Sequence, residues 1–403
     1  MLPFSDTVNR LQGLGAEKWA VHFRARALAA AGREIIELTI GEPDRAPDPS
    51  ILGALTDALA AGRIRYSDGR GEPALRDALA EKYTARSGRV VARDNILAVP
   101  GTQAALFSTI AALAGPGTEV ALPDPYYATY EGVIAASGAS LRPVPMLAED
   151  GFRLTPAALE AAITPATRVL LLNNPHNPTG TVLTAAEVAA VAEVCARYDL
   201  WIVSDEVYEA LIFDAESAFA SPFDMAEHAE RTVVVSSISK SEAVPGFRSG
   251  WIAGPAAFCT RVQPLVEMMF FGNQPFIADA TTHALRQPSP TAAALRGDYL
   301  RRATLAADIL AAAPGLKAML PQAGMFLMLD VRGTGLDGLG FAETLLDAQS
   351  VAVMPGNAFG AQAAGFVRLS LTVPDDRLAE ACRRVAAHGD SLNSRPLAAA
   401  ASA

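Results

Sequence analysis

Residues 236–250 read SSISKSEAVPGFRSG and directly follow the β-branched run TVVV at 232–235. Lys240 lies inside this stretch among small hydroxyl and apolar residues, and it is one of only four lysines in the chain. Burial lowers the pKa of a lysine, and a neutral amine can attack a carbonyl to form a Schiff base. Arg248 follows and stays charged. An amine beside a permanent cation suits an aldehyde cofactor that carries a phosphate, although this stretch alone also allows a solvated lysine at a strand end.

The composition favours an acidic protein that works on small molecules. The 403 residues are enough for two or three domains, and 51% of them are hydrophobic. No uninterrupted apolar run reaches the ~18 residues of a membrane helix. Residues 1–6, MLPFSD, lack the basic and apolar regions of a signal peptide, so we expect a cytoplasmic protein. The net charge of -10 offers no basic surface to nucleic acid or an anionic membrane.

The cysteines and histidines do not form a metal-binding pattern. Cys195, Cys259 and Cys382 stand in apolar surroundings without metal or redox spacing, so we expect buried free thiols. His176 has no second histidine or cysteine at ligand spacing. We therefore interpret it as an ordinary loop residue and expect no metal site.

Short apolar runs alternate with helical patterns through the first part of the chain. The runs that predict strands are 96–99, 119–122, 140–144, 168–172, 200–203 and 232–235. The helical patterns between them are 104–114, 127–137, 156–162 and 185–198. Apolar strands separated by helices indicate a mostly parallel sheet that is covered on both faces. In such α/β sheets ligands bind beyond the carboxyl ends of the strands.

Polar residues follow three of these strands at the end where a ligand is expected. Asn177 lies in the loop after 168–172, Asp205 and Tyr208 follow 200–203, and Lys240 follows 232–235. Each alone has an ordinary interpretation: a turn, a helix cap, a core aromatic or a surface lysine. All of them on one edge of a sheet favour a functional site.

A glycine turn after the strand at 96–99 leads into a helix and offers a place for an anion. Gly101, Thr102 and Gln103 form this turn, and a helix start presents unpaired N–H groups and the positive end of its dipole. Two further loops, at Gly41 and Tyr66, have the glycine punctuation that permits close contacts, but each also fits a plain surface turn.

The two ends of the chain predict a second, smaller domain. A helix is expected over 11–31, and a long helix from 290 to about 312 leads into strands at 325–331, 351–354 and 365–371. Arg368 interrupts the last strand, and the alternation alone favours an arginine that points outward. We divide the chain into an N-terminal segment 1–45 that joins the small domain, a large domain 46–285, a small domain 286–390 and a disordered tail 391–403.

In this order the motifs resemble the class I and II aminotransferases, pyridoxal-phosphate enzymes of the aspartate aminotransferase fold. The resemblance runs from about 19 to 387 and departs from the family at Ser249, where an apolar residue is usual. It rests on GEPD at 41–44, Tyr66 with Gly71, GTQ at 101–103, NPTG at 177–180, Asp205 with Tyr208, SxSK at 237–240, Arg248 and Arg368. It implies PLP fold type I: an α/β protein with a large domain built on a mostly parallel, mixed seven-stranded sheet, and a smaller α+β domain.

The resemblance also assigns roles. Lys240 would hold pyridoxal 5'-phosphate and move the substrate proton, Asp205 would pair with the pyridine nitrogen, and Asn177 and Tyr208 would bind the phenolate oxygen. Tyr127 would stack on the ring. The phosphate would lie among Gly101, Thr102, Gln103, Ser237, Ser239 and Arg248, with Tyr66 of the partner subunit in a homodimer. Arg368, with Gly41 and Asn177, would bind the substrate carboxylate, which contradicts the outward orientation that the pattern favours.

The substrate side chain is less constrained. Family members specific for dicarboxylates carry an arginine in the segment that here reads EMMFFGN at 267–273, or a lysine where Gln103 stands, and this chain has neither. The patterns WAVHFRA at 19–25, YSDGRG at 66–71, GMF at 324–326 and AFG at 358–360 resemble arginine–pyruvate transaminases. We therefore expect an amino donor such as arginine and a 2-oxo acid acceptor such as pyruvate, in a ping-pong mechanism.

Two alternatives are kept. A β-lyase, decarboxylase or oxidase can share the same cofactor contacts and differs in its products. A non-catalytic regulator that binds the cofactor usually carries a DNA-binding domain, for which the chain has no basic patch.

Overall fold

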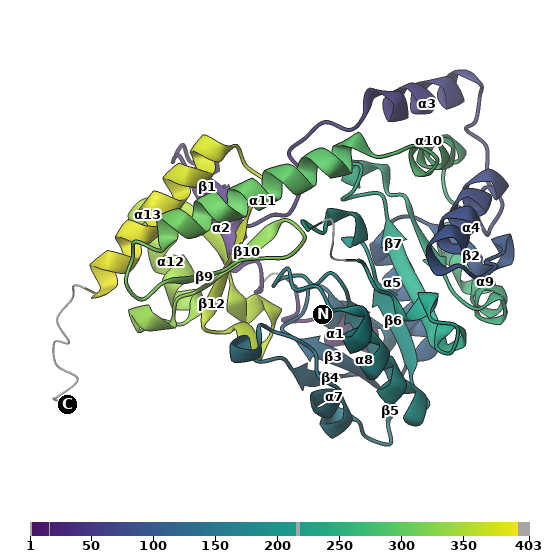
Figure 1. Cartoon of the computed structure of the whole chain (residues 1–403), viewed down its shortest axis with the longest axis horizontal. Coiled ribbons are helices and arrows are strands. Elements are labelled where there is room, and N and C mark those ends of the chain that lie inside the picture. The colour runs from purple at the N-terminus through teal and green to yellow at the C-terminus, as the bar shows by residue number, and fades with distance from the viewer. Residues whose placement is uncertain (1, 16, 215–217, 394–403) are drawn as a thin grey trace.

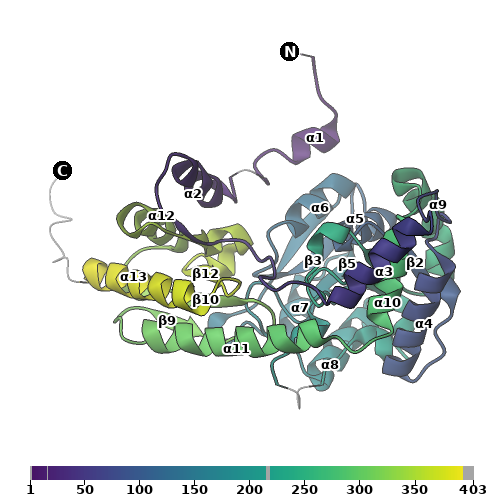
Figure 2. The ribbon, with the colours of Figure 1, turned by 90° about the horizontal axis from the view of Figure 1, so that it is seen from above.

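A computed structural model describes residues 2–15, 17–214 and 218–393, and its strands form two sheets (Figure 1). The larger sheet has seven strands and the smaller sheet has five. The long helix α11 (Pro290–Leu310) extends from the part that holds the seven-stranded sheet to the part that holds the five-stranded sheet (Figures 1 and 2).

The seven-stranded sheet is mixed and mostly parallel, as expected. In spatial order its strands are β2 (Ile96–Val99), β8 (Gly250–Ala253), β7 (Thr232–Ser237), β6 (Trp201–Asp205), β5 (Thr167–Asn173), β3 (Glu119–Asp124) and β4 (Ser140–Pro145). Strand β8 runs in the direction opposite to the other six strands and is antiparallel to both of its neighbours, β2 and β7. It is also the strand that the apolar runs did not predict, because it has four residues and begins with a glycine.

The direction of β8 explains the position of Lys240. Because β7 and β8 are antiparallel neighbours, with Ser237 opposite Gly250, the segment between them leaves and re-enters the sheet at the same edge. That edge is the carboxyl end of the parallel strands. Lys240 is therefore held where α/β sheets bind ligands.

Helices cover both faces of this sheet. Alternation along the strands sends Val203 and Val235 to one face, where they share a hydrophobic cluster, and sends Ile202 and Val234 to the other face, where they lie in two further clusters. The helices of this part are α3 (Pro49–Ala60), α4 (Pro73–Ser87), α5 (Thr102–Leu113), α6 (Tyr130–Ser137), α7 (Pro156–Ala162), α8 (Ala185–Arg197), α9 (Ala256–Phe270) and α10 (Pro275–Leu285).

The smaller sheet joins the two ends of the chain. In spatial order its strands are β1 (Ile36–Leu38), β11 (Val351–Pro355), β12 (Phe366–Ser370), β10 (Phe326–Asp330) and β9 (Lys317–Met319). It packs with α11 and with α2 (Ala20–Ala30), α12 (Gly338–Gln349) and α13 (Asp375–Asn393). The parallel pairing of β1 with β11 brings the N-terminal segment to this sheet.

The domain limits remain a prediction, and two details differ from expectation. The helix expected over 11–31 begins only at α2, and α1 (Asp6–Arg10) precedes it, because Gly13 adopts a positive φ of 80° between them. The tail expected from 391 starts inside α13, and its residues 394–403 lie outside the described part. Within the described residues, every helix is too short or too polar to cross a membrane.

Candidate active site

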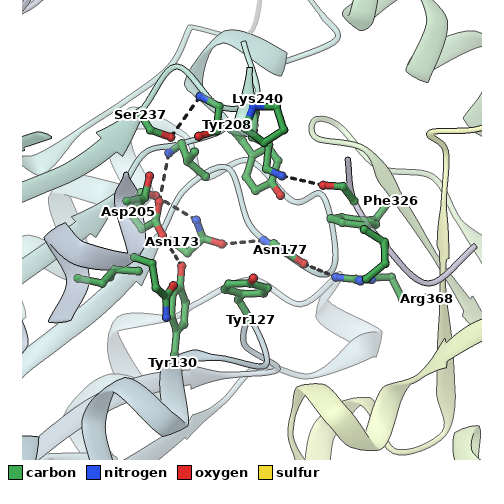
Figure 3. Close-up of a pocket in the computed structure, with 18 of the residues that line it drawn as sticks. Tyr127, Tyr130, Asn173, Asn177, Asp205, Tyr208, Ser237, Lys240, Phe326 and Arg368 are labelled. Atoms are coloured by element: carbon green, nitrogen blue, oxygen red, sulfur yellow. Dashed lines mark hydrogen bonds between the residues drawn. The ribbon is translucent and has the colours of Figure 1, made fainter. Parts of the chain in front are cut away.

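The ends of β5, β6 and β7 bring polar side chains to one cavity of about 240 Å³ at the carboxyl edge of the large sheet (Figure 3). Register places Asn173 beside Asp205, and Asp205 beside Val235, so the three strands end side by side. Two of the residues predicted for the site, Tyr66 and Gly101, do not line this cavity, although Gly101 directly precedes Thr102 at the start of α5. The others do line it: Gly41, Thr102, Gln103, Tyr127, Asn177, Asp205, Tyr208, Ser237, Ser239, Lys240, Arg248 and Arg368.

Lys240 projects into the cavity from the segment between β7 and β8. Its Nζ donates a hydrogen bond to the carbonyl oxygen of Gly41 at 2.6 Å. Burial lowers the pKa of Lys240 to about 8; nearby Glu42 opposes the shift, and Arg368 and Arg248 add to it. A substantial fraction of neutral amine is therefore present near neutral pH, as attack on an aldehyde requires.

Asp205 is a buried carboxylate with neutral partners. It is 3% exposed, and its Oδ2 accepts a hydrogen bond from the Tyr130 hydroxyl at 2.7 Å while its Oδ1 accepts one from the Val207 N–H at 3.2 Å. Burial raises the pKa of Asp205 to about 6, and the two hydrogen bonds oppose that shift. The carboxylate is thus ionised at neutral pH and available to a cationic ring nitrogen.

Two contacts of this site were not predicted from the sequence. Tyr130 belongs to α6, which begins three residues later than the helix expected from 127, and Asn173 ends β5. The Asn173 side chain donates to the carbonyl oxygen of Asp205 at 3.0 Å and accepts from the N–H of Asn177 at 2.8 Å. Both residues adjoin an apolar run, which is a sequence signal for a position near the edge of the sheet. Their shared partner Asp205 is 75 and 32 residues away along the chain, so the contacts themselves were not predictable.

Arg368 enters the cavity from β12 of the small sheet, so the expectation of an outward arginine is wrong. It is 1% exposed and lies between the rings of Phe326 and Phe359, with its guanidinium carbon 3.7 and 4.5 Å from the two ring centroids. Its nitrogens donate to the Asn177 side-chain oxygen at 3.0 Å and to the Thr39 carbonyl oxygen at 2.9 Å.

The Arg368 guanidinium keeps binding capacity for an anion. Burial lowers the pKa of Arg368 to about 10, so it is still a cation at neutral pH. Its Nε is buried without a hydrogen-bond partner. Unsatisfied buried donors are costly, and a carboxylate that accepts from this edge removes the cost.

The residues at the start of α5, together with Arg248, suit a phosphate. Gly101 precedes α5 with φ at 83°, and a Cβ at this position would lie 2.3 Å from Arg248 Nη2. The Thr102 hydroxyl is buried without a partner in the structure. A helix start, a close arginine and an unused hydroxyl together form an anion site. Ser237 and Ser239 border it, and the Ser239 N–H donates to the Ser237 hydroxyl at 3.3 Å.

The aromatic residues differ in position. Tyr127 packs edge-on against Tyr130, with ring centroids 5.5 Å apart, and Tyr208 is buried at the cavity wall, where burial raises the pKa of both Tyr127 and Tyr208. Tyr66 is 84% exposed, lies outside this cavity and contacts Phe271 on the surface. One chain therefore does not bring Tyr66 to its own site.

All three cysteine thiols are buried and free, as the sequence predicts. His176 contacts the Thr179 hydroxyl at 2.7 Å, and burial lowers the pKa of His176 to about 4. No group of three or more metal-ligating side chains occurs in the part of the chain that the structure describes.

These features fit pyridoxal phosphate. Lys240 could supply a reactive amine for its aldehyde, Asp205 could supply a carboxylate for its ring nitrogen, and the α5 start with Arg248 and Thr102 could supply partners for its phosphate. Arg368 remains free for the carboxylate of an amino acid.

Comparisons with known proteins give the same result. The family described as Aminotransferase class I and II matches residues 33–385. The chain is 44% identical over 383 residues to the arginine–pyruvate transaminase AruH of Pseudomonas aeruginosa, which covers 95% of this chain and 97% of that one. It is 35% identical to an aspartate/prephenate aminotransferase of Cereibacter sphaeroides, over 95% of this chain and 98% of that one.

Among solved structures, aspartate aminotransferase from Thermus thermophilus with maleate superposes with a TM-score of 0.90 at 32% identity, covering 96% of this chain and 100% of that chain. The aromatic aminotransferase of Pyrococcus horikoshii gives a TM-score of 0.85 at 32% identity, covering 88% and 95%. The chain belongs to the class I and II aminotransferases and is a pyridoxal-phosphate-dependent aminotransferase.

Proposed function

We propose that this aminotransferase moves the amino group of L-arginine to pyruvate. The observation that carries the proposal is the 44% identity to an arginine–pyruvate transaminase over almost the whole chain. The site supports it by exclusion: the charged residues that line the cavity are Asp205, Lys240, Arg248 and Arg368, and each has a partner among the cofactor groups or the substrate carboxylate. The second carboxylate of a dicarboxylate substrate would face Gln103, whose side chain carries no charge.

The roles of the site residues belong to the proposal. Bound pyridoxal phosphate supplies a ring that accepts electrons from the substrate Cα. Lys240 would take the proton from Cα as its neutral amine and, as the resulting cation, would deliver it to the cofactor carbon that carried the aldehyde, which its pKa of about 8 allows. Asp205 stays ionised and holds the ring nitrogen in its protonated form. Tyr208 and Asn177 bind the phenolate oxygen, and Tyr127 supports the ring.

The substrate carboxylate is bound by Arg368. Its planar guanidinium would donate to both carboxylate oxygens in a fork, which would fix the Cα–H bond relative to Lys240. Asn177 and the Thr39 carbonyl orient the guanidinium, and the rings of Phe326 and Phe359 exclude water around it.

Absorbance of the reconstituted enzyme during donor titration tests the proposal. We expect L-arginine to convert the bound cofactor to its amine form, pyruvate to reverse the conversion, and alanine to form in equal amount without ammonia. L-aspartate, L-phenylalanine and L-leucine are the comparison donors. Much faster turnover of an aromatic or branched-chain donor would refute arginine as the substrate, and ammonia release would indicate a β-lyase or oxidase, which the relatives do not favour.

We also propose a homodimer in which Tyr66 reaches the phosphate of the partner's site. The support is the exposure of Tyr66 together with apolar neighbours: Ile64, Met268 and Phe271 are 68%, 78% and 63% exposed. An open cavity of about 670 Å³ lies beside Tyr66 and Phe271. Exposed apolar groups of this kind commonly mark interfaces.

Mixed dimers separate this arrangement from one in which each chain is complete. If Tyr66 acts in the partner's site, subunits carrying Lys240→Ala and Tyr66→Ala form one intact site per mixed dimer, and tight cofactor binding returns on mixing. If each chain supplies its own tyrosine, mixing restores nothing. Sedimentation measures the oligomeric state directly.

A cytoplasmic location is the last part of the proposal, and three buried free thiols support it because cysteines stay reduced there. Fractionation of cells that express the protein from its own gene tests the location.

A further inference from the structure

A polar cluster outside the cavity connects the N-terminal helix α2 with the residues that follow β1. His22 on α2 is 6% exposed, and its Nδ1 lies 2.8 Å from the Thr39 hydroxyl and 3.0 Å from Glu37 Oε1. The Thr39 hydroxyl donates to the same Glu37 oxygen at 3.0 Å. Arg26 stands 3.8 Å from the other Glu37 oxygen. The side chains of these four residues have no role in the proposed chemistry; only the backbone carbonyl of Thr39 does, through Arg368.

The hydrogen bonds determine where the imidazole proton lies. A threonine hydroxyl has one proton, and Thr39 gives it to the Glu37 carboxylate, which can only accept. The Thr39 oxygen therefore accepts from His22, and His22 carries its proton on Nδ1. Burial lowers the pKa of His22, so at neutral pH the ring is neutral and the Nδ1–H tautomer is the one that this network selects.

Thr39 needs this support because the sheet does not hold it. The pairing of β1 with β11 ends at Leu38, opposite Val353, so Thr39 is the first residue beyond the ladder. From here the chain crosses to the active site as Thr39, Ile40 and Gly41. A further side-chain hydrogen bond to this crossing comes from the Thr372 hydroxyl, which donates to the Ile40 carbonyl oxygen at 3.3 Å.

The same short crossing supplies carbonyl oxygens to two site residues. The Thr39 carbonyl accepts from Arg368 Nη2 at 2.9 Å, and the Gly41 carbonyl accepts from Lys240 Nζ at 2.6 Å. The side chain of Thr39 thus contacts His22 while its backbone contacts the arginine that faces the cavity. A rotation of the Thr39 peptide would move the carbonyl oxygen that accepts from Arg368. The Arg368 guanidinium would then keep its hydrogen bond to the Asn177 side chain.

We propose that His22 is a positioning residue for substrate binding: its Nδ1–H fixes Thr39, and the Thr39 carbonyl holds Arg368 in the orientation that receives the substrate carboxylate. The proposal rests on the proposed role of Arg368 and is independent of which amino acid is the donor. Trp19 lines the cavity and packs edge-on against His22, with ring centroids 5.9 Å apart, so His22 also contacts a residue of the cavity wall. His22 touches neither substrate nor cofactor.

The experiment compares His22→Ala with His22→Asn in the reconstituted holoenzyme. The asparagine amide can replace the Nδ1–H donor, whereas alanine cannot. Loss of one neutral hydrogen bond in this network is expected to raise KM for both the amino donor and the 2-oxo acid about three- to tenfold. Because the carboxylate clamp is common to both substrates, kcat and the Kd of pyridoxal phosphate stay within about twofold. His22→Asn restores KM to within about twofold of wild type.

Propionate, which has the carboxylate and lacks the amino group, provides a readout that is independent of turnover. Its Kd, measured by calorimetry, should weaken in His22→Ala in proportion to KM. His228→Ala, which removes another buried histidine away from the cavity, is the matched control and should leave the Kd unchanged. Thr39→Val, which keeps the shape of the side chain and removes the hydroxyl, should reproduce the effect if His22→Ala does not fold.

Two results would overturn the proposal. One is a KM and propionate Kd in Thr39→Val and His22→Ala equal to those of His228→Ala. The other is an asparagine variant as impaired as the alanine variant, which would mean that packing alone is lost. Failure of L-arginine as a donor leaves this comparison intact, because KM is then measured with the donor that the enzyme does accept.

Discussion

Asp205 and Glu206 are consecutive carboxylates at the end of β6, and they have opposite environments. Asp205 lines the cavity and accepts hydrogen bonds from neutral groups only, Tyr130 and the Val207 N–H. Glu206 is 0% exposed on the other side of the strand and pairs with Arg86 at 2.8 Å. Chain alternation produces the difference, since successive side chains leave a strand on opposite faces.

The same contrast extends to the neighbouring residues. Behind the sheet, Arg86 also pairs with Glu209 at 2.6 Å and with Asp224 at 2.8 Å, and Lys82 pairs with Glu209, so every charge in this cluster has a counter-charge. In the cavity, the cations are hydrogen-bonded to neutral groups: Lys240 to Gly41, Arg248 to Pro245, and Arg368 to Thr39 and Asn177.

The difference separates charges kept for structure from charges kept for ligands. A buried charge without a counter-charge raises the free energy of the folded protein. Such a charge is expected where a bound ligand supplies the opposite charge. The ion pairs of Arg86 with Glu206 and Glu209 hold the segment 205–209, which contains Asp205 and Tyr208. Substitutions on the two sides of β6 should therefore affect different quantities.

The largest effect is expected at Lys240, in contrast to the partly exposed Lys82 of the paired cluster. Lys240→Ala removes both the covalent attachment and the proton carrier, so turnover should fall by at least about 10⁴-fold, the upper range for acid–base groups. Lys82→Met, in the paired cluster, should keep most activity and lower the free energy of unfolding. Turnover and thermal unfolding of both variants measure the contrast, and a Lys240→Ala enzyme at the wild-type rate would disprove the mechanism.

The consecutive carboxylates give the next largest effect. Asp205→Asn removes the charge that holds the protonated ring nitrogen, and we expect kcat to fall by about 10²–10³-fold with little change in unfolding free energy. Glu206→Gln removes one partner of Arg86, which keeps Glu209 and Asp224. Its unfolding free energy should fall by about 1–3 kcal/mol while kcat changes by less than about threefold.

Steady-state kinetics and urea unfolding on the same preparations check this pair. Equal losses of activity in the two variants would mean that the loop after β6 responds as a unit. The division between a ligand side and a structural side of the strand would then be wrong.

The sequence predicted one side of this comparison better than the other. Asp205, Tyr208, Asn177 and Lys240 were identified because the carboxyl ends of parallel strands meet at one edge, so residues that follow apolar runs must converge. That rule needs only strand order along the chain. It also predicted the class of fold, which the two sheets and the family match confirm.

The residues that the pattern missed depend on contacts between distant segments. Arg368 was expected to point outward because its strand alternates, but the rings of Phe326 and Phe359 bury it where the small sheet meets the cavity. The Arg86 cluster and the Tyr130 hydroxyl join segments more than 70 residues apart, which strand order does not reveal. Strand β8 was not predicted because it begins with Gly250, which leaves an apolar run of only three residues, 251–253.

The smallest effect concerns Tyr130 and the pH dependence of cofactor binding. Burial raises the pKa of Asp205 to about 6, and the Tyr130 hydroxyl opposes this by donating to the ionised carboxylate. Tyr130→Phe removes a donor that stabilises only the ionised form, so the pKa of Asp205 must rise further. A hydrogen bond to a charged group is worth about 1.5–3 kcal/mol net, and 1.36 kcal/mol equals one pKa unit, so an upward shift of at least about one unit is expected.

Cofactor affinity reports this shift because the ring nitrogen requires the ionised carboxylate. As the pH falls, the Kd of pyridoxal phosphate begins to weaken at the pKa of Asp205 in the unliganded protein, near 6 for the wild type and at least about one unit higher in Tyr130→Phe. Tyr126→Phe, which removes a neighbouring hydroxyl that lies 3.4 Å from Glu131 and does not contact Asp205, should leave the wild-type limb unchanged. An acid limb in Tyr130→Phe that coincides with the control would mean that the Asp205 carboxylate is held ionised by groups other than Tyr130. The asymmetry between the two faces of β6 would then depend on the Val207 N–H and on the cofactor itself.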